Sequence, residues 1–149
     1  MTIRNRLDAV AGAWLMARMN VQAHYRVRIE GFFEAAHNLR SYQGKPEPLH
    51  GHSWKVEAEA EASKPDSEGM ALDFAALKKE LNARIAKLDC AYINEIPPFT
   101  DLAPSAENIA RWLFDELEPG VRSEGCRLVE VRVWEGRHAS ASYRSAPPR

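Results

Sequence analysis

The chain of 149 residues, 45% hydrophobic and 28% charged, has the size and composition of a single globular domain. Its formal net charge of -1 provides no basic field for nucleic acid and no acidic tail for a cationic partner. No apolar run in the sequence approaches the ~20 residues of a membrane span. The two cysteines, Cys90 and Cys126, indicate reduced thiols rather than a disulfide framework, so we expect a cytoplasmic protein.

Residues 1–22 are predicted to form a helical extension that precedes the main domain. One helical stripe of this segment is apolar and contains Ile3, Leu7, Val10, Trp14 and Leu15. Asp8 and Arg18 interrupt the apolar centre that a signal peptide would need. We therefore interpret the segment as an amphipathic helix that covers part of the fold or a neighbouring subunit, rather than as a targeting peptide.

An alternating segment from Tyr25 to His37 predicts the first strand of the domain, which we assign to residues 23–146. Apolar residues such as Ile29 and Phe33 share parity with His37, whereas charged residues take the other parity. This alternation is typical of a half-buried strand. Gly31 within it indicates either a bulge or a close approach of another element.

A second strand is predicted from about Leu49 to Ala62, beyond a polar loop. His50 and His52 lie two residues apart, so in a strand both imidazoles leave the same face. A hairpin of the two strands brings His37 beside them. Three neutral imidazoles with an open fourth position form the ligand set of a catalytic zinc site. The alternative, three satisfied core histidines, would demand hydrogen-bond partners that are hard to supply at one point.

Two helices are predicted after the second strand. Asp73 can cap the first, which ends near Leu88 and has an apolar stripe of Phe74, Leu77, Leu81, Ile85 and Leu88. Ser105 can cap the second, whose sequence is AENIARWLFDEL. Pro119 and Gly120 are expected to stop this second helix.

The last two strands are predicted from Leu128 to Trp134 or Glu135, and from Ala139 to Arg144. Val129, Val131 and Val133 share parity with Glu135, so Glu135 either continues an apolar face or is solvated beyond the strand end. Residues 147–149 are expected to fray. The order strand, strand, helix, helix, strand, strand predicts an α+β domain, a four-stranded antiparallel sheet with both helices on one face. Its two free edges favour a homo-oligomer in which sheets join.

The chain resembles the 6-pyruvoyl-tetrahydropterin synthase / 6-carboxytetrahydropterin synthase family of tunnelling-fold (T-fold) proteins over roughly residues 25–144. The matching pieces, in order, are FEAAH, HGHSW, ALDF, LD at Leu88-Asp89, PSAEN and VRVWE. The resemblance implies trimers whose sheets close a barrel, two of which stack into a hexamer. It also implies Zn²⁺ held by His37, His50 and His52. Finally, it implies a pterin ring anchored by Glu135, with help from Ser105, Ala106 and Glu107, at a subunit interface.

Two positions depart from the family pattern. Members that make 6-pyruvoyl- or 6-carboxytetrahydropterin carry a cysteine four residues before HGH and an Asp-His pair that activates it. Here Pro46, which cannot accept a proton, and Asp89-Cys90 occupy these positions. Cys90 is either a reactive thiol in the place of the imidazole or a small buried hydrophobe. The second reading is favoured, because a neighbouring carboxylate opposes thiolate formation.

Glu47 lies three residues before His50 and creates the pattern E-x-x-H-G-H. This pattern resembles a branch of the family that cleaves the side chain of dihydroneopterin triphosphate to 6-hydroxymethyl-dihydropterin. A carboxylate near zinc can act as a general base; the other interpretation is a solvated loop residue between prolines. The chain is therefore predicted to be a zinc-dependent lyase on 7,8-dihydroneopterin triphosphate, with Glu47, Asp89 and Cys90 as catalytic candidates. The alternative is a catalytically silent homologue that binds zinc and pterin.

Overall fold

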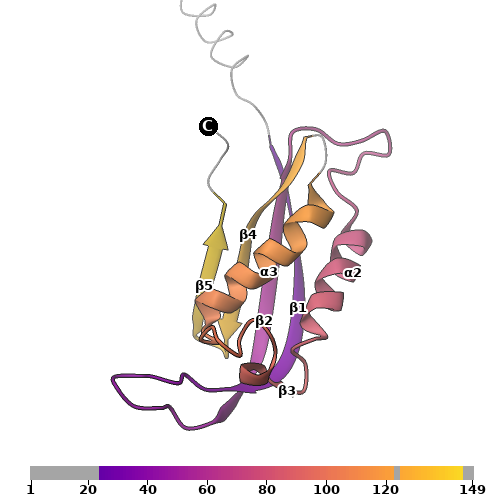
Figure 1. The fold of residues 1–149 in the computed structure, drawn as a ribbon. Coiled ribbons are helices and arrows are strands. Elements are labelled where there is room, and N and C mark those ends of the chain that lie inside the picture. Colours follow the sequence, from indigo (N-terminus) through magenta and orange to yellow (C-terminus); the bar gives the residue numbers. More distant parts are fainter. Residues whose placement is uncertain (1–23, 123–124, 146–149) are drawn as a thin grey trace, which may run out of the picture.

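The computed structural model describes residues 24–122 and 125–145. The predicted helix within residues 1–22 and the predicted frayed tail of residues 147–149 lie outside these ranges. Within them, a twisted sheet is covered on one face by two helices, while a long loop extends from one end of the sheet (Figure 1). None of the helices in the described ranges is both long and apolar enough to span a membrane.

The elements follow the predicted α+β order with one addition. They are β1 (Tyr25–His37), β2 (His50–Ala62), α2 (Phe74–Ile85), β3 (Ala91–Tyr92), the 3-10 helix η1 (Ile93–Glu95), α3 (Ala106–Val121), β4 (Cys126–Glu135) and β5 (Ala139–Arg144). The sheet order is β3-β1-β2-β4-β5. The sheet therefore has five strands rather than the predicted four, and β3 pairs parallel to β1. A two-residue strand has no periodicity of its own, so only its contact with β1 reveals it.

The hairpin of β1 and β2 forms the centre of the sheet and has the predicted register. The pairing runs antiparallel from Tyr25 opposite Ala62 to His37 opposite His50. Gly31 pairs with Val56 without a bulge. A Cβ atom at Gly31 would lie 2.8 Å from Cδ1 of Ile85, so this glycine marks a close approach of α2 to β1.

Strand β4 contains the irregularity of the sheet. Glu130 pairs with Glu59, whereas Leu128 pairs with Ala60, so Val129 is an extra residue in a bulge. The bulge changes which parity faces the core, because one extra residue reverses the alternation of side chains. Leu128 precedes it and Val131 follows it, and both are buried. The prediction that Val129 shares the buried face is therefore wrong.

The helices begin where predicted and end elsewhere. Oδ1 of the cap Asp73 accepts a 2.8 Å hydrogen bond from the Ala75 N–H, and α2 ends at Ile85 rather than near Leu88. Phe74 is 60% exposed and does not belong to the buried stripe. Helix α3 continues through Pro119 to Val121, so the predicted stop at Pro119 is wrong.

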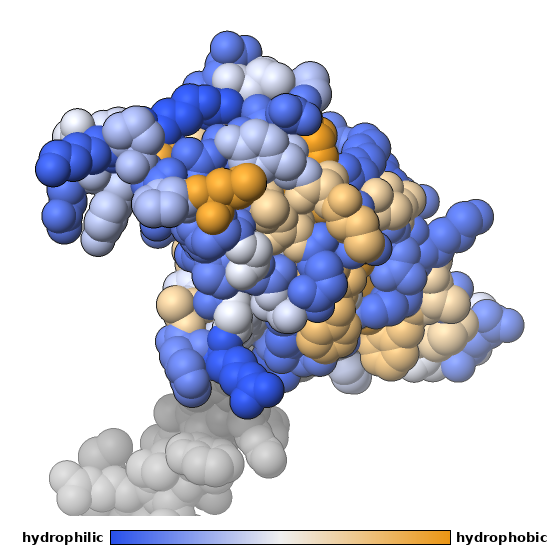
Figure 2. Space-filling view, turned by 90° about the horizontal axis from the view of Figure 1, so that it is seen from below, coloured by the Kyte–Doolittle hydropathy of each residue, from blue (hydrophilic) through white to orange (hydrophobic). Residues whose placement is uncertain are grey.

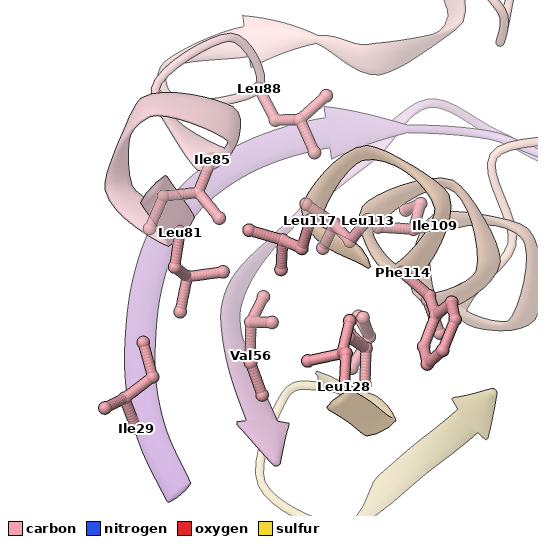
Figure 3. Close-up of a cluster of buried hydrophobic side chains, with 14 of the residues drawn as sticks. Ile29, Val56, Leu81, Ile85, Leu88, Ile109, Leu113, Phe114, Leu117 and Leu128 are labelled. Carbon is pink, nitrogen blue, oxygen red and sulfur yellow. The ribbon is translucent and has the colours of Figure 1, made fainter. Parts of the chain in front are cut away.

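The core lies between the two helices and the sheet. Figure 3 shows Leu81 and Ile85 of α2 and Leu113 and Leu117 of α3 pointing toward Val56 and Leu128 of the sheet. The last turn of α3 contributes Val121, which is 5% exposed. Burial of this side chain explains why the helix continues past a proline near its end, where only one intrahelical bond is lost.

Candidate metal centre and active site

Three histidines meet where β1 and β2 end. The ring centroids of His37 and His50 are 4.7 Å apart, and those of His37 and His52 are 5.3 Å apart. The convergence follows from the hairpin register, which places His37 opposite His50 and leaves His52 two residues further on the same face. The structure thus brings together the three residues that the sequence predicts as metal ligands.

Glu135 is the fourth member of this cluster. Its Oε1 lies 2.8 Å from Nε2 of His37 and 3.2 Å from Nε2 of His52. It is the last residue of β4, where it pairs with Trp54 of β2. One ligand atom from each of the four residues lies within 4.8 Å of all the others. The solvated interpretation of Glu135 is wrong, since the carboxylate points at the imidazoles and the side chain is 30% exposed.

Backbone carbonyls orient two of the imidazoles. Nδ1 of His37 lies 2.8 Å from the carbonyl oxygen of Pro104, and Nδ1 of His50 lies 2.8 Å from that of Pro48. A carbonyl only accepts, so Nδ1 carries the proton in both rings and Nε2 offers a lone pair to the cluster. This is the arrangement that orients metal-bound histidines.

The buried Nε2 atoms favour a metal ion at this point. Nε2 of His37 and Nε2 of His52 are buried and make no well-aligned hydrogen bond within the described part of the chain. Unpaired buried polar atoms are rare and require an explanation. Several nitrogen atoms converging on one point fit a cation that prefers imidazole, such as Zn²⁺.

The electrostatics of His52 agree with this assignment. Burial lowers the pKa of its imidazole, and the neighbouring His37 and His50 lower it further, although Glu135 acts in the opposite direction. The neutral form is the one that coordinates a metal. His52 is therefore uncharged near neutral pH and available as a ligand.

A cavity of about 350 Å³ opens beside the cluster. His37 of the metal cluster lines this cavity. Its walls also include five residues predicted for catalysis or pterin binding, namely Glu47, Ser105, Ala106, Glu107 and Glu135. Ser105 caps α3 and accepts from the Asn108 N–H at 3.4 Å. Because Ser105, Ala106 and Glu107 line the cavity, the N-terminal turn of that helix forms part of its wall. Figure 2 views the molecule from the loop end of the sheet and shows a mainly hydrophilic surface interrupted by hydrophobic side chains.

Several lining residues were not predicted from the sequence. They are Leu39 and Tyr42 in the loop after β1, and Ala139, Ser140 and Ala141 at the start of β5. The loop has no periodic pattern, and β5 reaches the cavity only because it pairs with β4 up to Glu135 opposite Ala139. No local signal in the sequence identifies them.

Glu47 is half-buried, whereas its neighbours Pro46 and Pro48 are exposed. Its Oε2 accepts a 3.1 Å hydrogen bond from the Leu39 N–H, and its own N–H donates to the Leu39 carbonyl at 2.9 Å. A freely solvated loop side chain would have neither burial nor such partners. The structure therefore favours the interpretation of Glu47 as a residue of the cavity.

Asp89 and Cys90 lie outside this cavity. Oδ1 of Asp89 accepts from the Glu34 N–H at 2.9 Å, and the Cys90 N–H donates to the Glu34 carbonyl at 2.6 Å. These bonds attach β3 to β1. Cys90 is exposed and adopts a φ of 55°; the expectation of a small buried hydrophobe is wrong. It lines a separate hollow that also includes His52 and Ser53.

A sheet with two helices on one face and a histidine–carboxylate cluster at the end of its central hairpin defines an α+β protein of the T-fold class. The family model described as 6-pyruvoyl tetrahydropterin synthase matches residues 26–146. The chain therefore belongs to this family, whose named members are enzymes that act on pterins.

Individual relatives differ in the reactions that their names state. A 6-carboxy-5,6,7,8-tetrahydropterin synthase of Synechocystis is 36% identical over 100 residues, which cover 61% of this chain and 76% of the relative. A dihydroneopterin monophosphate aldolase of Pyrococcus furiosus is 29% identical over 111 residues, covering 74% and 90%. Among solved structures, the 6-pyruvoyl tetrahydropterin synthase of Caenorhabditis elegans has a TM-score of 0.73 at 20% identity, covering 84% of this chain and 98% of that one.

Proposed function

We propose that the chain is a zinc-dependent lyase that cleaves the side chain of 7,8-dihydroneopterin triphosphate, or of a close relative, to 6-hydroxymethyl-dihydropterin. The observation that carries this proposal is a cavity lined by Glu47, Glu135 and His37, of which the last two belong to the metal cluster. The ordinary family pattern has a cysteine at the position of Pro46, and Glu47 supplies a carboxylate at the next position. A relative named as an aldolase on dihydroneopterin monophosphate supports carbon–carbon cleavage in particular.

The pterin ring is assigned to the carboxylate of Glu135. The 2-amino-4-oxo edge of a pterin offers adjacent N–H donors, and one carboxylate can accept two of them in a bidentate geometry that gives specificity. Ser105, Ala106 and Glu107 at the start of α3 line the same cavity. They are proposed to hold the remaining polar edge of the ring.

Glu47 is proposed to act as the general base. It accepts the proton of the second side-chain hydroxyl, the bond between the first and second side-chain carbons breaks, and that hydroxyl carbon leaves as an aldehyde. The electron pair passes into the dihydropterin ring, and Glu47 returns the proton to the first carbon, which becomes the hydroxymethyl group. A zinc ion held by His37, His50 and His52 would act as a Lewis acid on substrate oxygen atoms and lower the pKa of a bound hydroxyl.

A solved structure of the same fold provides a precedent for a catalytic glutamate. The 6-pyruvoyltetrahydropterin synthase of Plasmodium vivax, 18% identical to this chain, is described as having a catalytic glutamate, for which alanine and cysteine variants have solved structures. At that identity the likeness extends to the fold only. Transfer of the role to Glu47 rests on its position in the cavity of this chain.

The direct test incubates the purified, zinc-loaded chain with 7,8-dihydroneopterin triphosphate and with its monophosphate, and separates the pterin products by chromatography. We expect 6-hydroxymethyl-dihydropterin together with a phosphorylated two-carbon aldehyde. If the chain turns over none of the dihydropterin substrates, the proposal that it is a lyase is refuted. Tight pterin binding without product would instead support the silent zinc- and pterin-binding homologue. The replacement of the family cysteine by Pro46 favours this alternative.

Assembly into a trimer or hexamer is part of the same proposal. Among the described residues, β3 pairs with Ala35 and Ala36 of β1, the rest of the outer edge of β1 has no strand partner, and β5 forms the opposite edge. Open edges pair readily with other strands, and the family resemblance implies a barrel closed in this way. Light scattering on the purified chain should give the mass of three or six copies, and a monomer would contradict this part of the proposal.

A further inference from the structure

The loop from residue 38 to residue 49 between β1 and β2 carries the proposed base, and most of its residues are exposed. Exposed loops are usually mobile, yet a catalytic group must be held to within about 0.5 Å of its productive position. The contacts that hold Glu47 therefore decide whether it can work as a base.

Both the backbone and the side chain of Glu47 are bound to the two residues that follow His37. Asn38 Nδ2 donates to the Glu47 carbonyl at 3.1 Å, and the Leu39 N–H donates to Oε2 of Glu47 at 3.1 Å. The Glu47 N–H returns a 2.9 Å bond to the Leu39 carbonyl. Since Asn38 directly follows His37, these bonds tie the carboxylate to the end of the strand that carries a metal-cluster residue.

Asn38 is itself fixed from the side of β3 and η1. Asn94, which is 6% exposed, accepts from the Asn38 N–H at 3.0 Å and donates to the Asn38 carbonyl at 2.8 Å. The Asn94 side chain thus satisfies both backbone polar groups of Asn38, as a neighbouring strand would. The Tyr92 hydroxyl donates to Oδ1 of Asn38 at 2.5 Å, so the amide orientation is determined: its oxygen accepts from Tyr92 and its nitrogen donates to Glu47.

We infer that Asn38, held by Asn94 and Tyr92, is a positioning residue that holds Glu47 in the wall of the cavity that His37 and Glu135 also line. This inference rests on the proposed function. It assigns the segment of β3 and η1 a part in catalysis through hydrogen bonds, without contact with the substrate. Arg40 supports the same segment, since its guanidinium donates to the Asn94 carbonyl at 3.1 Å.

The test compares Asn38→Ala with the parent in kcat, KM, zinc content and pterin affinity. Loss of the Nδ2 bond leaves Glu47 held, among the described residues, by Leu39 alone. The carboxylate is then less well positioned, so kcat should fall by about 10- to 100-fold, within the range that a misplacement near 1 Å can cost. KM, zinc content and pterin affinity should stay near the parent values, because the histidines and Glu135 are untouched. Tyr92→Phe, which removes only the hydroxyl, should also lower kcat. This variant replaces Asn38→Ala in the test if Asn38→Ala does not fold.

Matched controls are Asn82→Ala on the exposed side of α2 and Tyr143→Phe, whose ring stacks edge-on against Phe114. Neither should change kcat. A second readout is the hydrogen exchange of the Leu39 amide, which should speed up in Asn38→Ala and Tyr92→Phe and not in the controls.

A double-mutant cycle with Glu47→Gln separates positioning from a general structural role. If Asn38 acts through Glu47, Asn38→Ala should cause little further loss of kcat in the Glu47→Gln background, because residues that act as a unit are not additive. Equal losses in both backgrounds, or an unchanged kcat in an active parent, would overturn the inference and leave the proposed function intact. A parent with no turnover would overturn both.

Discussion

Glu135 has two possible roles at the scale of the single residue. Its Oε1 lies 2.8 Å from Nε2 of His37, within the metal cluster, and its side chain also lines the cavity. A fourth protein ligand would close the tetrahedral set that is usual for structural zinc, whereas a catalytic zinc keeps one position open. The proposed lyase requires the open position, so the proposal gives the carboxylate to the pterin ring and not to the metal.

Glu135→Gln tests this assignment through binding. The amide cannot accept two N–H donors as a carboxylate does, so ring donors remain unpaired in a buried site. We expect pterin affinity to fall by roughly 10- to 100-fold, corresponding to the 1–3 kcal/mol cost of such groups, while zinc content stays at the parent level. Calorimetric titration with a pterin and metal analysis would measure both, and loss of zinc with unchanged pterin affinity would identify Glu135 as a metal ligand instead.

Glu47→Gln should separate chemistry from binding. The substitution keeps size and polarity but removes the proton acceptor, so turnover should fall by about 10²–10⁴. Zinc content and pterin affinity should barely change. Single-turnover rates measured beside pterin affinity would decide the matter. If this variant turns over at the rate of the parent, Glu47 of the E-x-x-H-G-H pattern is not the general base.

At the scale of elements, the contact of α2 with β1 depends on the absence of a side chain at Gly31. The nearest atoms to a Cβ built there are Cδ1 of Ile85 at 2.8 Å and Cδ2 of Leu81 at 3.1 Å. Both neighbours are buried, at 6% and 0% exposure, so neither can move without disturbing the core. Packing thus explains a glycine within a strand.

Gly31→Ala is expected to lower the free energy of unfolding by about 1–3 kcal/mol, the usual cost of overpacking a core. Urea denaturation followed by circular dichroism measures the change. Gly120→Ala is the matched control: a Cβ there meets its nearest atom at 3.7 Å, and alanine in a helix is favoured by up to about 1 kcal/mol. Equal midpoints for the parent and Gly31→Ala would disprove the close approach.

At the scale of the whole molecule, the sheet face away from the helices is a ladder of paired charges. Glutamates of β2 face arginines of β1 and β4, as in the pairs Arg26–Glu59 at 3.1 Å and Arg127–Glu61 at 2.7 Å. A face so charged does not join the core of the chain. It leaves the sheet open toward solvent or toward the interior of the proposed barrel.

Glu130 makes the stability of this face depend on pH. Burial tends to raise the pKa of its carboxyl, but hydrogen bonds from Arg132 and Arg144 outweigh burial and lower it. A lowered folded pKa means that the carboxylate stabilises the fold above its ordinary pKa of about 4.3, and that this stabilisation is lost as pH falls through the folded value.

Glu130→Gln should therefore cost about 1 kcal/mol in the free energy of unfolding at pH 7, in the range of hydrogen bonds to charged groups. The difference from the parent should shrink as the pH falls below about 4.3. Urea denaturation at several pH values would measure this trend. Glu116→Gln, in an exposed pair 3.7 Å from Lys87, is the control with a small effect at every pH, and a gap that widens in acid would contradict the prediction.

Local patterns in the sequence determined the central hairpin, the convergence of the three histidines and the caps Asp73 and Ser105. These features depend on residues near each other in the chain: alternation with period two sets the face of every side chain, and a register slip would expose the whole buried face. The spacing of Glu47 to His50 singled it out as a catalytic candidate, and the structure places it in the wall of the cavity that His37 also lines.

Only the tertiary structure decided β3, the bulge at Val129, the continuation of α3 past Pro119 and the joining of Glu135 to the histidines. It also decided the bonds between Asn38 and Asn94, which lie 56 residues apart in the chain. Each of these depends on contacts between distant segments whose strength exceeds a local preference, as burial of Val121 exceeds the helix-breaking tendency of Pro119. Such contacts leave no periodic signal, so the shape of the cavity emerges only when the sheet is assembled.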